Sequence, residues 1–191
     1  MTDSTDPQPI LARESFLPFF RPDVGQAEID AVSDVLRSGW LTYGPKVREF
    51  GDACGAYLGV PHALPVASCS AGLFVTLKAL GIGPGDEVVL PSLTFIATLT
   101  AIRHCGAHPV LADVDTANLG LDPAAFERAI TPRTRAVIPV HLAGHPCRIE
   151  EIIAIARAHD VKVVEDAAHS FGAEVRGQRL GGLGDATVFS F

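Results

Sequence analysis

The spacing of apolar and polar residues alternates along the chain between two patterns. Short runs rich in valine, isoleucine and leucine alternate with longer segments in which apolar residues recur every three or four positions. The short runs predict buried β-strands, and the longer segments predict helices with one apolar face. We expect strands at residues 62–68, 86–92, 108–115, 135–141, 161–166 and 185–191, and helices at 25–36, 70–81, 94–106, 122–130 and 148–160. Strands and helices in alternation predict a mostly parallel sheet sandwiched by helices, the α/β class.

The composition is typical of a globular protein and argues against some classes of partner. Hydrophobic residues make up 48% of the 191 positions and charged residues 19%, so the chain has enough apolar residues for a substantial core. The formal net charge of −7 argues against nucleic-acid binding, which needs a basic face. No apolar run reaches the roughly 18 residues of a membrane helix, so we expect no membrane partner.

The N-terminal segment differs from the rest of the chain. It is polar and contains prolines, which predicts a flexible arm over residues 1–18 followed by one domain over residues 19–191. It is also acidic where a secretory signal would be basic. The four cysteines lie far apart, and without an export signal we interpret them as reduced thiols. The cytoplasm is therefore the expected location.

Polar residues follow the ends of several predicted strands. In open parallel sheets, ligands bind outside the carboxyl ends of the strands, so these residues form a candidate cofactor site. Loops carry polar residues in any case, and each one could instead be an ordinary surface residue. The candidates at the strand ends are Ser68, Ser70, Ser92, Thr94, Asp113, Asp115, His141, Asp166 and Ser190.

Two of these strand ends carry the sharper signals. The segment ASCSAGL leads from a predicted strand into a helix whose first turn holds Ser70 and Ala71. Unpaired amides at a helix start suit a phosphate, although an ordinary serine cap would have the same sequence. Asp166 follows a valine-rich strand, where burial of a carboxylate is costly unless a cation meets it. The protonated ring nitrogen of pyridoxal phosphate would be such a cation.

Several sequence blocks, taken in order, resemble the DegT/DnrJ-type sugar aminotransferases, a family of fold-type-I pyridoxal-phosphate enzymes. The resemblance extends from about Phe19 to Phe191 and rests on SGWLTYGPKVREF, VASCSAGL, GDEVVLPSLTFIATLTAI, VIPVHLAGHP, VVEDAAHSFGA and GDATVFSF. Cys69 replaces a glycine of the family's phosphate cup, and Arg148 replaces an acidic residue that often caps a helix. The resemblance implies the large domain of this fold, with the small C-terminal domain absent from this chain.

The resemblance also implies roles for individual residues. Asp166 would pair with the ring nitrogen of the cofactor, Phe95 would stack on its pyridine ring, and His169 would bond near its phenolic oxygen. Of these, Asp166 and His169 would take part in catalysis. The remaining implied contacts are Ser70, Ala71 and Ser190 with the cofactor phosphate, and Trp40, Thr42 and Tyr43 with the substrate.

The activity implied by the resemblance is that of a pyridoxal-phosphate-dependent aminotransferase. It would move an amino group from a donor, glutamate in this family, to the keto group of a nucleotide-linked sugar, and it would act as a homodimer. The sugar would serve a cell-surface polysaccharide or an antibiotic. The family's cofactor-binding lysine lies just beyond Phe191, so we expect the 191-residue chain alone to be inactive. We interpret Lys46, Lys78 and Lys162 as surface residues.

Three alternatives stay open at this point. A dehydratase of the same family would carry histidine in place of the lysine, and a regulatory or scaffold protein would keep the fold without the chemistry. A metal enzyme could use His141, His145 and Cys147, because imidazole and thiolate are zinc ligands. Gly144 and Pro146 in the same stretch are, however, typical of a loop.

Overall fold

The computed structural model describes residues 16, 18 and 21–191 of the chain. The chain divides between Gly44 and Pro45 into two compact units. Apart from residues 16 and 18, the predicted arm over residues 1–18 lies outside the described residues. The predicted domain boundary at residue 19 also falls outside them and stays a prediction.

The first unit contains helix α1 (Gln26–Ser38), where the sequence predicts a helix. The amide of Gly25 donates to the Glu28 carboxylate at 2.7 Å just before the first turn. The helix ends at Gly39, whose φ of 71° lies in the left-handed region. A residue with a Cβ would be strained there, which is why glycine marks the end of this helix.

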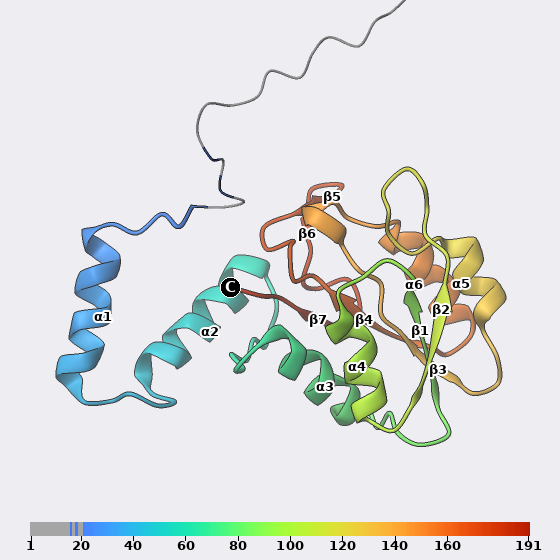
Figure 1. Cartoon of the computed structure of the whole chain (residues 1–191), viewed down its shortest axis with the longest axis horizontal. Coiled ribbons are helices and arrows are strands. Elements are labelled where there is room, and N and C mark those ends of the chain that lie inside the picture. The colour runs from blue at the N-terminus through green and yellow to red at the C-terminus, as the bar shows by residue number, and fades with distance from the viewer. Residues whose placement is uncertain (1–15, 17, 19–20) are drawn as a thin grey trace, which may run out of the picture. The chain divides into compact units, whose positions relative to one another are not determined.

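The second unit is built on a five-stranded sheet in the order β2-β1-β3-β4-β7. Every pair of neighbours is parallel, so all five strands run in the same direction (Figure 1). This topology confirms the predicted α/β class. The strands are β1 (Glu87–Pro91), β2 (His108–Ala112), β3 (Thr134–Val137), β4 (Lys162–Asp166) and β7 (Ala186–Val188), with a separate antiparallel hairpin of β5 (Glu174–Val175) and β6 (Gln178–Arg179).

Helices cover both faces of this sheet (Figure 1). Successive side chains of β1 alternate between the faces, so that Val88 and Leu90 pack with α3 and α4 while Val89 packs with α5 and α6. No helix among the described residues has the length and apolar character needed to cross a membrane. The helices of this unit are α2 (Pro45–Leu58), α3 (Cys69–Ala79), α4 (Ile96–His104), α5 (Pro123–Ala129), α6 (Ile149–Ala158) and a 3-10 turn at Leu142–Gly144.

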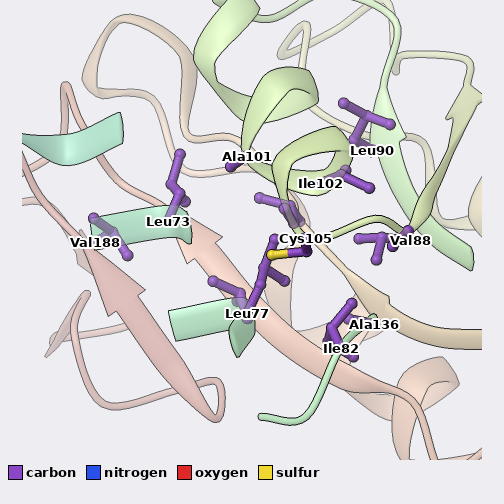
Figure 2. Packing of buried hydrophobic residues seen from close by; sticks show 13 residues of the cluster. Leu73, Leu77, Ile82, Val88, Leu90, Ala101, Ile102, Cys105, Ala136 and Val188 are labelled. Carbon is purple, nitrogen blue, oxygen red and sulfur yellow. The ribbon is translucent and has the colours of Figure 1, made fainter. Parts of the chain in front are cut away.

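The hydrophobic core beneath α3 and α4 holds the first turns of these two helices in place over the sheet. Leu73 and Leu77 of α3 and Ile102 of α4 lie fully buried against Val88 and Val188 of the sheet (Figure 2). Close packing of this kind holds the start of each helix at a set position over the strand ends. Both helix starts carry predicted site residues.

The strand predicted at residues 62–68 is wrong, because these residues form an irregular segment between α2 and α3. Pro65 has no amide hydrogen to donate and cannot complete a sheet ladder at its position. The segment packs on α2 instead. A Cβ placed on Gly51 would lie 2.8 Å from the carbonyl oxygen of Ala63, so glycine allows this close approach.

Candidate cofactor site

The carboxyl ends of β1, β4 and β7 lie at the same edge of the sheet because the strands are parallel. Asp166, the last residue of β4, lies opposite Val188, the last residue of β7, and Ser190 follows two positions later. Helix α3 reaches the same edge, since a Cβ placed on Gly72 would lie 2.7 Å from Val188 Cγ1. The fold therefore brings the start of α3 and the end of β7 to the strand end that carries Asp166.

Asp166 is buried on the face of the sheet that α3 and α4 cover. Val164, two residues earlier in β4, belongs to the core on that face, and side chains two apart in a strand point the same way. Asp166 is 5% exposed. Its Oδ2 accepts a hydrogen bond from Thr98 Oγ1 at 2.8 Å, and its Oδ1 accepts a longer one from the Ala168 amide at 3.3 Å. Both donors are uncharged groups.

Asp166 differs from the other buried carboxylates in lacking a cationic or imidazole partner. Glu87 pairs with Arg133, and Glu165 lies 3.0 Å from a nitrogen of His141. No arginine, lysine or histidine in the described part of the chain forms an ion pair with Asp166. Burial of an uncompensated carboxylate is costly. A protonated pyridine nitrogen would supply the missing positive charge, so Asp166 fits pyridoxal phosphate.

Phe95 lies at the start of α4 and is 72% exposed. An aromatic ring this exposed at a strand end has a face available for stacking on a planar ligand. The Thr98 amide donates to the carbonyl oxygen of Phe95 at 3.1 Å, and the Thr98 side chain reaches Asp166. The predicted stacking residue and the predicted ring-pairing residue are therefore joined through one turn of α4.

At the start of α3, Ser70 is accessible to a phosphate, whereas the Ala71 amide already has a hydrogen-bond partner. Ser68 caps the helix, and its hydroxyl accepts a hydrogen bond from the Ala71 amide at 3.1 Å. A phosphate at Ala71 would have to share or replace that bond. Ser70 is exposed, and its amide precedes the first helical hydrogen bond, which Gly72 donates to Ser68 at 2.9 Å. Ser68 thus forms the ordinary serine cap that was the alternative to a phosphate site, and Ser70 lies beside it.

His169 and Ser190 are both exposed in segments that follow β4 and β7. The Nδ1 atom of His169 accepts a hydrogen bond from the Ala143 amide at 3.2 Å. The proton of the neutral ring therefore resides on Nε2, which is the donor available to a ligand. The cofactor contacts expected of both residues stay predictions.

Cys69 lies half-buried at the start of α3. Burial, and to a lesser extent the negative charge of Asp166, raise the pKa of the Cys69 thiol to about 11. The thiol therefore stays protonated at neutral pH and adds no nucleophile to the site. The cysteine that replaces the family's glycine is therefore not expected to take part in the chemistry of the site.

Glu165 points to the face opposite Asp166 and is fully buried. Its Oε1 accepts from the Gly184 amide and the Thr187 hydroxyl, both at 2.9 Å, and its Oε2 meets His141 Nε2. His141 Nδ1 accepts from the Cys147 amide at 3.2 Å. Both nitrogens of His141 thus form hydrogen bonds within the fold, so His141 is not available as a zinc ligand. The described residues contain no group of three metal-binding side chains.

The predicted substrate residues Trp40, Thr42 and Tyr43 belong to the first unit, after α1. The indole amine of Trp40 donates to the Tyr43 carbonyl oxygen at 3.1 Å. Residues 38–42 line a shallow hollow of about 280 Å³. Because these residues belong to a unit separate from the sheet, their contact with a substrate stays a prediction.

The three lysines of the chain are exposed, as predicted. Lys162 opens β4, whereas Asp166 ends it, and Lys162 forms an ion pair with Asp185 at 3.0 Å. Lys78 lies in the last turn of α3, at the far end from Ser70. Lys46 lies in the first turn of α2 and forms an ion pair there.

Thr98, whose hydroxyl holds the carboxylate of Asp166, is not among the predicted site residues. A signal for it exists in the printed sequence. Thr94 and Thr98 are four residues apart in a mostly apolar segment, and that spacing brings two side chains together on one face of a helix. Their hydroxyl oxygens are 2.7 Å apart in the structure.

Comparison with known sequences identifies a family. A sequence model of the DegT/DnrJ/EryC1/StrS aminotransferase family matches residues 22–191. The spore coat polysaccharide biosynthesis protein SpsC of Bacillus subtilis (strain 168) is 49% identical over 182 residues, which are 95% of this chain and 47% of SpsC. The chain thus spans about half the length of the relatives that it matches.

Solved structures agree with this match. The aminotransferase from Psychrobacter cryohalolentis has a TM-score of 0.88 at 37% identity, over 91% of this chain and 45% of that one. Spr1654 of Streptococcus pneumoniae, assigned as a sugar aminotransferase, has a TM-score of 0.87 at 36% identity. The match covers 92% of this chain and 48% of Spr1654, and it holds for both a PLP form and a PMP form. These neighbours confirm the predicted fold-type-I architecture. The cofactor forms indicate pyridoxal phosphate, as the sequence analysis predicts.

Proposed function

Because the chain belongs to the DegT/DnrJ/EryC1/StrS aminotransferase family, we propose that it is the cofactor-binding part of a sugar aminotransferase. The proposed reaction moves an amino group from glutamate to the keto group of a nucleotide-linked sugar. One observation carries the proposal: Asp166 is buried at the end of β4 without a cationic partner among the described residues. The name of SpsC, a spore coat polysaccharide biosynthesis protein, supports polysaccharide synthesis as the setting.

The residues of this chain would bind and orient the cofactor. Asp166 would accept the ring N–H through a carboxylate that Thr98 already holds. Phe95 would stack on the ring, and Ser70 and Ser190 would donate to the phosphate. When bound, pyridoxal phosphate supplies an electron sink for the negative charge that develops at the reacting carbon. His169 would donate its Nε2 proton toward the phenolic oxygen of the cofactor.

The proposal extends to the assembly and location of the protein. A homodimer is the state that the family resemblance implies, and size-exclusion chromatography with light scattering would measure it. The four cysteines are free thiols, which suits a reducing compartment and supports the cytoplasm. Trp40, Thr42 and Tyr43 would contact the nucleotide-linked sugar.

The test uses the complete natural polypeptide that contains this chain. It should retain one pyridoxal phosphate per chain after desalting and form 2-oxoglutarate from glutamate when a nucleotide-linked keto-sugar is present. Asp166→Asn should lose both properties, because an amide cannot balance a pyridinium. Asp160→Asn is the matched control, since Asp160 is exposed and its φ of 54° is one that asparagine tolerates.

The outcomes of this test separate the open alternatives. Cofactor binding without 2-oxoglutarate formation would favour the dehydratase. A wild-type protein that retains no cofactor would overturn the proposal and favour a scaffold role. Equal cofactor retention by wild type and Asp166→Asn would show that Asp166 does not bind the cofactor, and would overturn the proposal.

A further inference from the structure

We propose that Thr98 is the positioning residue for Asp166, and that Thr94 in turn orients Thr98. This inference rests on the proposed function, because it concerns how the acid that meets the cofactor ring is held. Thr98 is fully buried, and its Oγ1 lies 2.8 Å from Asp166 Oδ2 and 2.7 Å from Thr94 Oγ1. Threonine hydroxyls serve here as links between a helix and a strand.

The direction of the two hydrogen bonds follows from counting protons. An ionised carboxylate only accepts, so Thr98 must donate its single hydroxyl hydrogen to Asp166. The Thr98 oxygen then has only lone pairs left for Thr94, and Thr94 must be the donor between them. The chain of hydroxyls therefore runs one way, from Thr94 in the loop between β1 and α4 to the buried carboxylate.

This bond sets the relation between the two groups that would hold the cofactor ring. Thr98 lies in the first turn of α4 and is linked to Phe95, the residue that caps this helix, by a 3.1 Å backbone hydrogen bond. Asp166 lies 68 residues away from Thr98, on β4. Because Phe95 would define the plane of the ring and Asp166 would meet its edge, the Thr98 bond fixes one contact with respect to the other. A hydrogen bond between buried groups, such as Thr98 and Asp166, is also stronger than one at the surface.

The bond also sets the orientation in which the Asp166 carboxylate meets a ligand. Oδ2 already accepts the short bond from Thr98, while Oδ1 accepts only the 3.3 Å bond from the Ala168 amide. A carboxylate oxygen can accept two hydrogen bonds, so each oxygen keeps capacity for a further donor, and Oδ1 has the weaker present bond. Without Thr98, the carboxylate could rotate and lose this orientation.

The experiment compares four variants of the complete polypeptide, at Thr94, Thr98 and Thr100, by titration with pyridoxal phosphate. Thr98→Val keeps the shape of the side chain but removes the hydroxyl, and we expect the Kd to rise about tenfold, as for one hydrogen bond to a charged group. Thr98→Ser restores a hydroxyl and should return the Kd to within about threefold of wild type. Thr100→Val is the matched control, because Thr100 lies in α4 and donates only to Ala97, at 3.2 Å.

A second readout separates positioning from a loss of packing. The absorbance of the bound cofactor, followed against pH, reports when its ring nitrogen loses a proton. That transition should move to lower pH in Thr98→Val and stay in place in Thr98→Ser and Thr100→Val. Thr94→Val should shift the Kd in the same direction by a smaller factor, about threefold, since it removes only the second bond.

Two results would overturn the inference while leaving the proposed function intact. The first is a wild-type Kd and an unchanged pH transition in Thr98→Val. The second is a Thr98→Ser variant that binds as weakly as Thr98→Val, which would assign the effect to packing. A wild-type protein without cofactor affinity would instead overturn the proposed function, and this inference with it.

Discussion

At the scale of single residues, two adjacent carboxylates on β4 have different surroundings. Glu165 accepts hydrogen bonds from Gly184 and Thr187 and meets His141, so its charge is well satisfied in the fold itself. Asp166 accepts only from neutral donors and lacks a cationic partner within the described residues. Substitution of Asp166 should therefore weaken ligand binding at little cost in stability, whereas substitution of Glu165 should lower stability.

The first prediction concerns Asp166→Asn in the absence of cofactor. The amide oxygen can still accept from Thr98, and the amide nitrogen gives up only the long 3.3 Å bond from the Ala168 amide. The substitution also removes a buried charge that has no cationic partner among the described residues. We expect the free energy of unfolding, measured with urea, to stay within about 1 kcal/mol of wild type or to rise. A clear loss of stability would indicate that Asp166 serves the fold and not a ligand.

The second prediction concerns Glu165→Gln. The amide would present an N–H to at least one group that is itself a donor, leaving a buried polar group unsatisfied. We expect the free energy of unfolding to fall by about 2–3 kcal/mol. Glu151→Gln is the control, because its ion pair with Arg148 is exposed and should be worth less than about 1 kcal/mol. Equal effects of the two substitutions would contradict the structural role of Glu165.

At the scale of elements, the site depends on how closely α3 approaches β7. Gly72 lies in the first turn of α3, directly over Val188, the last residue of β7. A Cβ at this position would lie 2.7 Å from Val188 Cγ1 and 3.3 Å from Val66 Cγ2. The absence of a side chain at Gly72 therefore brings the start of α3, with Ser70, to the end of the strand that leads to Ser190.

The third prediction is that Gly72→Ala both destabilises the protein and weakens cofactor binding. The new methyl group must push α3 away from β7, which should lower the free energy of unfolding by about 1–3 kcal/mol. Gly83→Ala is the control, because a Cβ there would meet no atom closer than 4.0 Å. Thermal unfolding and pyridoxal-phosphate titration measure the two effects, and a Gly72→Ala variant that matches Gly83→Ala in both would refute the close approach.

At the scale of the whole molecule, the second unit divides its polar groups between the two ends of the sheet. The carboxyl ends carry the candidate site, while the amino end of β1 carries Glu87, held by Thr131 and Arg133. The hydrogen bond from Thr131, and further the bonding and charge of Arg133, lower the pKa of the Glu87 carboxyl, while burial acts in the opposite direction. These contacts tie β1 to the loop that precedes β3.

The fourth prediction is a pH dependence of stability through Glu87. Because its pKa is lowered in the folded state, ionised Glu87 stabilises the fold above its unfolded value of about 4.3. That contribution is lost as the pH falls through the folded pKa. Glu87→Gln should therefore cost about 1–3 kcal/mol at pH 7 and markedly less at pH 3, measured by urea unfolding at both values.

The control for this prediction is Glu127→Gln, an exposed position on α5. It should change the free energy of unfolding by less than about 0.5 kcal/mol at either pH. A Glu87→Gln cost that is the same at pH 7 and pH 3 would mean that the charge of Glu87 contributes nothing, and that only its shape matters.

Most elements could be predicted from the sequence, because periodicity is a local property. The run that ends in Asp166 predicts a buried strand, and α6 (Ile149–Ala158) follows the expected helical spacing. The segment at residues 62–68 has the same apolar character but forms no strand, since Pro65 cannot donate to a ladder. Local pattern therefore predicts what a segment could form, while the available partners decide whether it does.

The sequence by itself determined the α/β class, the family and the strand end that carries Asp166. Only the tertiary structure decided which of the two adjacent acids is left without a cationic or imidazole partner. Thr98 lies 68 residues from Asp166, and His141 lies 24 residues from Glu165, so neither pairing is visible in local sequence. The order of the strands brings these groups together, and hydrogen bonds and charges act only over the few ångströms that the fold creates.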